Sequence, residues 1–222
     1  MRFGNPKDPS QKDYNATFAS LLSGVNTTKP PTIYKTVYSD ATLLVDPFFP
    51  EGFRRGFYGP QTSKITTSYL GQITNEFNNY LAGVLANGDV PASAVFVLQF
   101  MFPGLNVNIP KSNDATGWSH ADAGHQTLFS PGYSKISTDA LTLKDTIKFN
   151  KITHDHQATV GGFIADYPNY ISPDSTGRQV WGDNVPRLIQ VKQKYDPLCR
   201  IHHGKVFATE ACRVAGFANV FA

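Results

Sequence analysis

One long stretch of the chain, residues 62–85, carries apolar side chains at every third or fourth position. Its apolar residues are Ile65, Tyr69, Ile73, Phe77, Tyr80, Leu81 and Val84. This spacing places them on one face of an α-helix, and the Asn87-Gly88 pair that follows is typical of a helix C-terminus. The pattern therefore predicts an amphipathic helix that buries this face.

Other stretches have the patterns of strands. Residues 94–102 have the sequence AVFVLQFMF and end at Pro103-Gly104, which predicts a short buried strand. Residues 117–133 predict a loop that leads into another strand. Residues 32–46 are rich in β-branched and aromatic side chains and predict one or two more strands. The Pro- and Gly-rich residues 47–61 indicate no regular structure.

Three further stretches have helical features. Residues 9–23 have apolar side chains at helical spacing after a Pro-Ser pair. Residues 183–195 have the same spacing and stop at Asp196-Pro197, which predicts an amphipathic helix. Residues 141–160 are ambiguous and favour a helix only weakly.

The order of these elements predicts the α+β class. We expect an antiparallel β-sheet that contains residues near 94–102 and 123–130. Helices near residues 62–86 and 183–195 should cover it on one face. A parallel, doubly wound sheet would contradict this prediction.

The composition is that of a globular protein. Hydrophobic residues make up 41% of the 222 residues and charged residues 17%, a balance that does not fit a disordered chain. The formal net charge is only +3, with Lys and Arg scattered along the chain, so we expect no nucleic-acid partner. We also expect no membrane partner, because no run approaches the ~20 apolar residues of a membrane-spanning helix.

Histidines and cysteines are the candidate metal ligands. His154-Asp155-His156 would place two imidazoles on one side of a strand, and His202-His203 are adjacent, but no third ligand stands at a zinc-site spacing. We therefore expect no metal site and favour surface or hydrogen-bonded histidines. Cys199 and Cys212 could pair in an oxidising compartment, which a count of two cysteines does not decide.

The sequence lacks the motifs of two common site types. It has no G-x-S-x-G nucleophile motif, and Gly161-Gly162 is too short to be a glycine-rich phosphate loop. The remaining candidate is the tetrapeptide Tyr167-Pro168-Asn169-Tyr170. A tyrosine phenol can act as a base or a donor, and an Asn amide can donate and accept at the edge of a heterocycle. The tetrapeptide also fits a turn with two packing tyrosines, and both interpretations stay open here.

The tetrapeptide and the residues after it resemble a known family. It is followed by Trp181-Gly182-Asp183-Asn184-Val185-Pro186-Arg187-Leu188 and then by Val191-Lys192-Gln193-Lys194-Tyr195-Asp196-Pro197. This order is similar to the C-terminal end of the berberine bridge enzyme-like FAD-linked oxidases. There a Y-x-N-Y segment precedes an N-x-x-R-L segment and a lysine-rich helix that ends in D-P. Trp181 departs from the tyrosine or phenylalanine that is usual at its position.

The resemblance implies an FAD-dependent oxidoreductase that oxidises an alcohol, sugar or alkaloid-like substrate with oxygen as acceptor. It implies Tyr167 as the catalytic residue, and Asn169 and Tyr170 as cofactor-binding residues that lie against the flavin and in the pocket wall. It also implies two parts, a substrate-binding α+β domain at residues 1–165 and a C-terminal segment at residues 166–222 that returns toward a flavin domain.

Nothing in the sequence resembles that flavin domain. We therefore expect two partners, a small-molecule substrate and a flavin-binding domain missing from this chain. A flavin-free binding protein or cyclase and an inactive fragment remain as alternatives. We expect a secreted or extracellular protein, with sequons at Asn15-Ala16-Thr17 and Asn26-Thr27-Thr28, although the first 15 residues have no apolar run that could serve as a signal peptide.

Overall fold

The structure is a computed structural model. It describes residues 37, 39, 40, 43, 46, 49–99, 117, 124–161, 164–202, 206–207, 209–214 and 220–221. The chain divides into two compact units, Met1–Pro47 and Phe48–Ala222, and every element named below belongs to the second. The helix predicted at residues 9–23 lies outside the described residues, as does most of the stretch 32–46. The predicted boundary between residues 165 and 166 stays a prediction.

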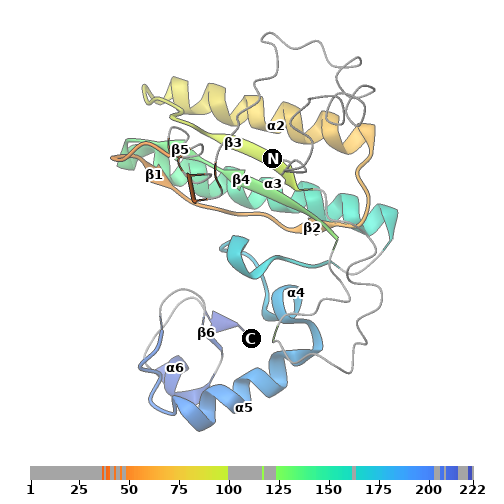
Figure 1. Ribbon diagram of the computed structural model, residues 1–222, viewed down its shortest axis with the longest axis vertical. Helices are drawn as coiled ribbons and strands as arrows, with labels where there is room; N and C mark the ends of the chain where they lie inside the picture. The colour runs from red at the N-terminus through yellow and green to blue at the C-terminus, as the bar shows by residue number, and fades with distance from the viewer. Residues whose placement is uncertain are drawn as a thin grey trace. The chain divides into compact units, whose positions relative to one another are not determined.

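Short runs of strands and runs of helices follow one another along this unit (Figure 1). The strands are β1 (Arg54–Arg55), β2 (Gln61–Thr62), β3 (Val95–Gln99), β4 (His125–Ser130), β5 (Gly132–Tyr133), β6 (Val206–Phe207) and β7 (Val220–Phe221). The α-helices are α2 (Thr67–Ala86), α3 (Asp139–Val160), α4 (Gly177–Trp181), α5 (Val185–Tyr195) and α6 (Glu210–Val214). Three short 3-10 helices are η5 (Ile136–Thr138), η6 (Pro168–Tyr170) and η7 (Gly182–Asn184).

The central sheet is antiparallel, in the order β2-β4-β3. β1 pairs with β5, and Tyr58 forms a bridge with Phe129, so residues 54–62 run beside residues 125–133 in one uninterrupted register. The expectation of no regular structure at residues 47–61 is therefore wrong for residues 54–61. Gly and Pro shorten the strands there without changing the pairing, because the Pro60 carbonyl still accepts from the backbone N–H of Thr127, 3.1 Å away.

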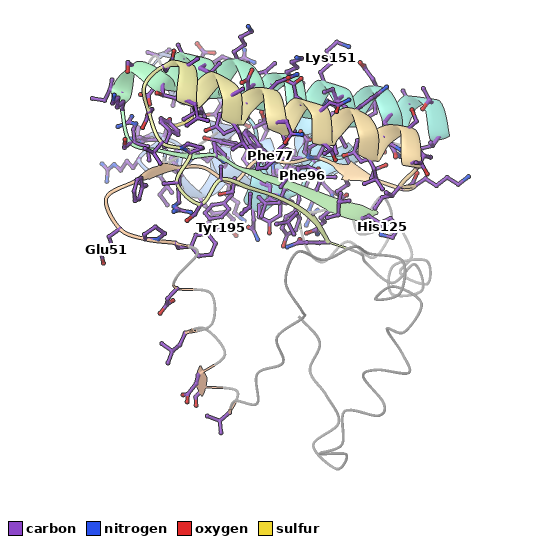
Figure 2. The ribbon with its side chains drawn as sticks, turned by 90° about the horizontal axis from the view of Figure 1, so that it is seen from above. Glu51, Phe77, Phe96, His125, Lys151 and Tyr195 are labelled. Atoms are coloured by element: carbon purple, nitrogen blue, oxygen red, sulfur yellow. A yellow bond between two sulfur atoms is a disulfide. The ribbon has the colours of Figure 1, made fainter. Side chains whose placement is uncertain are left out.

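Helices α2 and α3 pack side by side and cover one face of this sheet (Figure 2). Phe77 of α2 and Phe96 of β3 lie in the layer between the two helices and the sheet. Phe129 of β4 stacks on Phe149 of α3, with ring centroids 4.2 Å apart, and meets the Tyr80 ring edge-on at 5.1 Å. These contacts form the apolar core. The predicted α+β fold, an antiparallel sheet with helices on one face, is confirmed.

The two covering helices differ from the expected pair. α2 is the helix predicted from residues 62–85, and the Thr66 side chain caps it by accepting from the N–H of Tyr69. The second helix beside it is α3, whose sequence pattern is weak because its buried face is largely polar. That face carries Thr142, Thr146, Phe149, Asn150, Thr153 and Gln157. The predicted helix at residues 183–195 exists as α5, but it packs with α4, η7 and β6. Its assignment to the sheet was wrong.

Polar contacts and a disulfide hold the end of the chain after α5. The Asp196 carboxylate accepts the backbone N–H groups of Arg200 and Ile201 at 2.7 and 2.9 Å, and the Lys192 ammonium donates to it. Cys199 and Cys212 form a disulfide. The Lys192 hydrogen bond is the main cause that lowers the pKa of Asp196 to about 2.

Among the described helices, none combines the length and apolarity that a membrane span requires.

Candidate functional site

The tetrapeptide at residues 167–170 lies beside the outer side of β2. The backbone N–H of Gln61 donates to the Ala165 carbonyl at 2.7 Å, and Pro60 and Asp166 form an antiparallel bridge. The chain then turns through η6, and the Tyr170 carbonyl accepts the N–H of Gly59 at 2.9 Å. Residues 165–167 therefore run along the outer edge of β2, paired through one isolated bridge, and this pairing fixes the tetrapeptide to the sheet.

The structure brings the three predicted site residues together. The Asn169 side-chain amide donates to the Tyr167 hydroxyl oxygen at 3.0 Å. The Tyr167 and Tyr170 rings meet edge to face, with centroids 5.0 Å apart at an angle of 74°. Both tyrosines are half-buried and Asn169 is exposed. The tetrapeptide is thus both a turn and a cluster of polar groups, and the catalytic and cofactor-binding roles of these residues stay predictions.

Sequence reasoning missed a glutamine that joins this cluster. The Gln99 side-chain amide, at the end of β3, donates to the Tyr170 hydroxyl oxygen at 3.2 Å. In the sheet Gln99 lies opposite Gln126 of β4, and Gln126 lies opposite Gln61 of β2. Directly opposed residues in an antiparallel sheet point to the same face. Three glutamines therefore form a row across the sheet that ends at Tyr170.

This glutamine row (Gln61, Gln126 and Gln99) lies on the face that α2 and α3 do not cover. Phe96 and Leu98 of β3 pack into the helix-facing core, so Gln99, the next residue, points the other way. Gln61 is 2% exposed, and neither its amide nitrogen nor its amide oxygen has a hydrogen-bond partner. Buried polar groups are rarely left unpaired without a reason. Gln126 is 6% exposed, so of the three amides only that of Gln99 is half-buried and can reach a ligand.

A glycine lets the segment before β2 approach β4 closely. Gly59 lies between Tyr58 and Pro60, which pair with β4 and with Asp166. A Cβ atom on Gly59 would lie 1.9 Å from the carbonyl oxygen of Thr127, so no other residue fits without moving the strand. The sequence shows this glycine only as a break in a strand pattern, and its role follows from the pairing.

The candidate metal residues lie on a helix and not on a strand. His154-Asp155-His156 belongs to α3, so the predicted placement of both imidazoles on one side was wrong. The His156 Nε2–H donates to the Lys64 carbonyl at 2.7 Å, and its ring stacks on Tyr69 at 4.4 Å. His154 Nε2 lies 2.7 Å from an Asp166 carboxylate oxygen. Within the part of the chain that the structure describes, no group of three or more His, Cys, Asp or Glu residues could hold a metal ion.

The buried tyrosines of the helix-covered face are distinct from the tyrosines of the site. Burial raises the pKa of Tyr69 and of Tyr80 to about 12. A phenol in that state holds its proton at neutral pH and is a poor general base. Both residues are at most 1% exposed, so a substrate could not reach them. Tyr167 and Tyr170, half-buried at the other face, are the accessible pair.

Comparison with known proteins supports the resemblance of the C-terminal part. Residues 166–199 match the family model described as berberine and berberine like. Residues 166–199 are therefore similar to this family. This berberine-like segment, residues 166–199, begins at Asp166 and ends at Cys199, so it contains the whole tetrapeptide and all of α5.

One solved structure is similar to a larger part of the chain. It is a chitooligosaccharide oxidase, with a TM-score of 0.38 and 19% sequence identity over 65% of this chain. The aligned part, which extends beyond the berberine-like segment, covers 30% of the length of that structure. No curated protein matches the chain.

Proposed function

We propose that this chain provides the substrate-binding wall of an FAD-linked oxidoreductase that uses oxygen as acceptor. The wall is the face of the sheet that α2 and α3 do not cover, with Gln99 and the tetrapeptide of the berberine-like segment. The observation that carries the proposal is the Asn169–Tyr167 hydrogen bond of 3.0 Å, next to Tyr170 and Gln99. It places two accessible phenols and two amides within one short stretch of surface.

Tyr167 is the proposed catalytic residue. The Asn169 amide donates to its hydroxyl oxygen and holds that oxygen in place. The phenol can then orient a substrate hydroxyl as a donor, or as the phenolate take the proton of that hydroxyl. The edge-to-face contact with Tyr170 limits rotation of the Tyr167 ring, which keeps the oxygen in one position.

The accessible amides give the site its chemical preference. An amide side chain offers both donors and an acceptor, so the half-buried Gln99 and the exposed Asn169 match a substrate that carries hydroxyl groups. We propose a hydroxyl-bearing substrate, an alcohol or a sugar, ahead of an alkaloid-like one.

FAD is the proposed cofactor, and one structural feature fits it. Asn169 has an exposed side-chain amide beside the two tyrosines, the group needed to contact the polar edge of a flat heterocycle. Tyr170 would line the same contact. When bound, FAD supplies the acceptor for the hydride that leaves the substrate. The residues of this chain would bind the substrate, orient its hydroxyl group and move its proton.

Two further proposals concern the setting of this site. We propose that a flavin-binding domain outside residues 1–222 supplies the phosphate contacts, since the tetrapeptide can touch only one edge of the cofactor. The chain is also proposed to be secreted or extracellular. The Cys199–Cys212 disulfide supports this, because disulfides persist mainly in oxidising compartments.

The test is Tyr167→Phe in this chain assembled with its flavin-binding domain. General-base contributions are about 10²–10⁴-fold in rate, so we expect oxygen consumption to fall at least a hundredfold. The melting temperature should change little, because one half-buried hydroxyl contributes about 0.5–1.5 kcal/mol. Tyr80→Phe, on the helix-covered face, is the matched control and should leave the rate unchanged.

If Tyr167→Phe retains turnover but loses stability, Tyr167 is a packing residue. If no assembly binds FAD, the redox proposal fails.

A further inference from the structure

His154 and Asp166 form a buried pair between α3 and the start of the berberine-like segment. His154 Nε2 lies 2.7 Å from Asp166 Oδ1, and the two side chains are 14% and 1% exposed. The second carboxylate oxygen of Asp166 is buried and has no hydrogen-bond partner. A carboxyl group that is removed from water is costly unless something compensates for it. In the described part of the chain, His154 is the side chain that does so.

The backbone of Asp166 is held as firmly as its side chain. Its N–H donates to the Gln179 carbonyl of α4 at 2.8 Å. On the strand's other edge it forms the bridge to Pro60, next to the hydrogen bond between Gln61 and Ala165. Asp166 is therefore a point at which α3, α4 and the sheet are joined.

The position of Asp166 in the sheet determines where Tyr167 points. Successive residues of an extended strand point to opposite faces. Asp166 lies opposite Pro60 and points to the face that α3 covers, where His154 meets it. Tyr167 has an extended backbone, with φ −85° and ψ 130°, so its ring points to the opposite face. There it meets Tyr170, which accepts from Gln99.

We propose that His154 and Asp166 are positioning residues for Tyr167. The pair lies behind the sheet, touches neither substrate nor cofactor, and fixes the strand from which the Tyr167 phenol extends. When the pair is broken, the 165–167 strand shifts relative to β2, and the phenol moves with it. The inference rests on the proposed catalytic role of Tyr167 for its effect on rate, while its effect on the position of the ring does not depend on that role.

A second ion pair on α3 provides the comparison. Lys148 of α3 contacts Glu76 of α2 at 2.5 Å, and the two side chains are 52% and 6% exposed. Both pairs tie α3 to a neighbouring segment, but the Glu76 pair joins two helices away from the tetrapeptide. If the pairs on α3 act only through stability, breaking either one should have the same kind of consequence. If the His154 pair positions Tyr167, only that pair should affect the ring.

The experiment follows the Tyr167 ring by NMR in the full chain with ¹³C-labelled tyrosine. Tyr167→Phe assigns the resonance by removing it. We expect His154→Leu and Asp166→Leu to shift or broaden the Tyr167 resonance. His154→Gln and Asp166→Asn keep a donor and an acceptor at the same places and should restore it. Glu76→Gln should lower the melting temperature and leave the resonance in place. An unmoved Tyr167 resonance in both leucine variants would overturn the proposal.

If the leucine variants do not fold, kinetics of the flavin-containing assembly provide the test. A misplacement of about 1 Å can cost up to about 10²-fold in rate, so we expect His154→Ala, which removes the partner of Asp166, to lower kcat by a smaller factor, about threefold to tenfold, with KM unchanged. His154→Gln, which keeps a donor, should stay near the unmodified rate. The loss in His154→Ala should disappear in the Tyr167→Phe background, because the pair acts through Tyr167. An equal loss in both backgrounds would overturn the proposal. A Tyr167 resonance that depends on the pair, together with full turnover in Tyr167→Phe, would overturn the proposed function and leave the positioning pair standing.

Discussion

The two faces of the β2-β4-β3 sheet use the same strands for different purposes. On the helix-covered face, Phe96 and Phe129 pack with the aromatic rings of α2 and α3. On the other face, three residues away along the same strands, Gln99 and Gln126 oppose each other beside the tetrapeptide. The first face is built from side chains that gain by leaving water, and the second from side chains that need a partner. Because successive residues of a strand point to opposite faces, the residues that stabilise the fold and those proposed to bind the substrate lie on different faces of one sheet.

The largest expected effect tests the helix-covered face. Phe129 is 1% exposed and touches rings from both helices. Phe129→Ala should lower the free energy of unfolding by about 3–5 kcal/mol, because the change removes apolar burial and leaves a cavity. Denaturant unfolding measures it. A loss below about 1 kcal/mol would mean that this ring is not central to the core.

The next expected effect is an increase in the free energy of unfolding. Gln61 has two buried polar atoms without partners, and their desolvation costs about 1–3 kcal/mol. Gln61→Met keeps the length of the side chain and removes that cost, so the free energy of unfolding should rise. Gln157→Met, at a buried glutamine of α3 that is hydrogen-bonded, is the control and should destabilise the protein. A loss of stability in Gln61→Met would contradict the unpaired state of the Gln61 amide.

A smaller expected effect is a loss of stability at alkaline pH, caused by two buried tyrosines of the helix-covered face. Burial raises the pKa of Tyr69 and Tyr80 to about 12, so in the unfolded chain these phenols lose their protons first. The stability that they contribute is complete below about pH 10 and is lost as the pH rises toward about 12. The double variant Tyr69→Phe with Tyr80→Phe should flatten this alkaline loss. Unfolding at several pH values measures it, and an unchanged slope would contradict the burial of these phenols.

The smallest effect lies outside both faces. The hydrogen bond from Lys192 is the main cause that lowers the pKa of Asp196 to about 2, from an ordinary value of 3.8. The stability that this carboxylate contributes is present above the ordinary value and is lost as the pH falls through about 2. Asp196→Asn should remove that acid dependence while both faces of the sheet stay intact. A Tyr167 resonance unchanged in this variant would show that the turn after α5 does not position the site.

The helix α2 was predictable because its apolar side chains follow a single period. α3 was not, because Thr146, Asn150 and Thr153 occupy positions on its buried face. Their hydroxyl and amide groups hide the apolar period while they still pack against the sheet. The same limit applied to His154, which the sequence placed on a strand because its helix was not recognised.

The tetrapeptide was predictable, and its surroundings were not. The family resemblance identified Tyr167, Asn169 and Tyr170, which the structure brings into contact. The glutamine row depends on which residues of β2, β4 and β3 stand opposite one another. That register is a long-range property, since residues 61 and 126 are far apart in the chain, and no local pattern contains it.

The single register between residues 54–62 and 125–133 has a consequence for evolution. Because the two faces alternate residue by residue, a substitution at Gln99 or Gln126 can alter what the protein recognises and leave the aromatic core untouched. Inserting or deleting one residue near Gly59 would instead exchange the faces of the strand beyond it, burying amides among the rings. Descendants of this sequence should therefore diversify their substrates by substitution here, and accept changes of length only in the connecting loops.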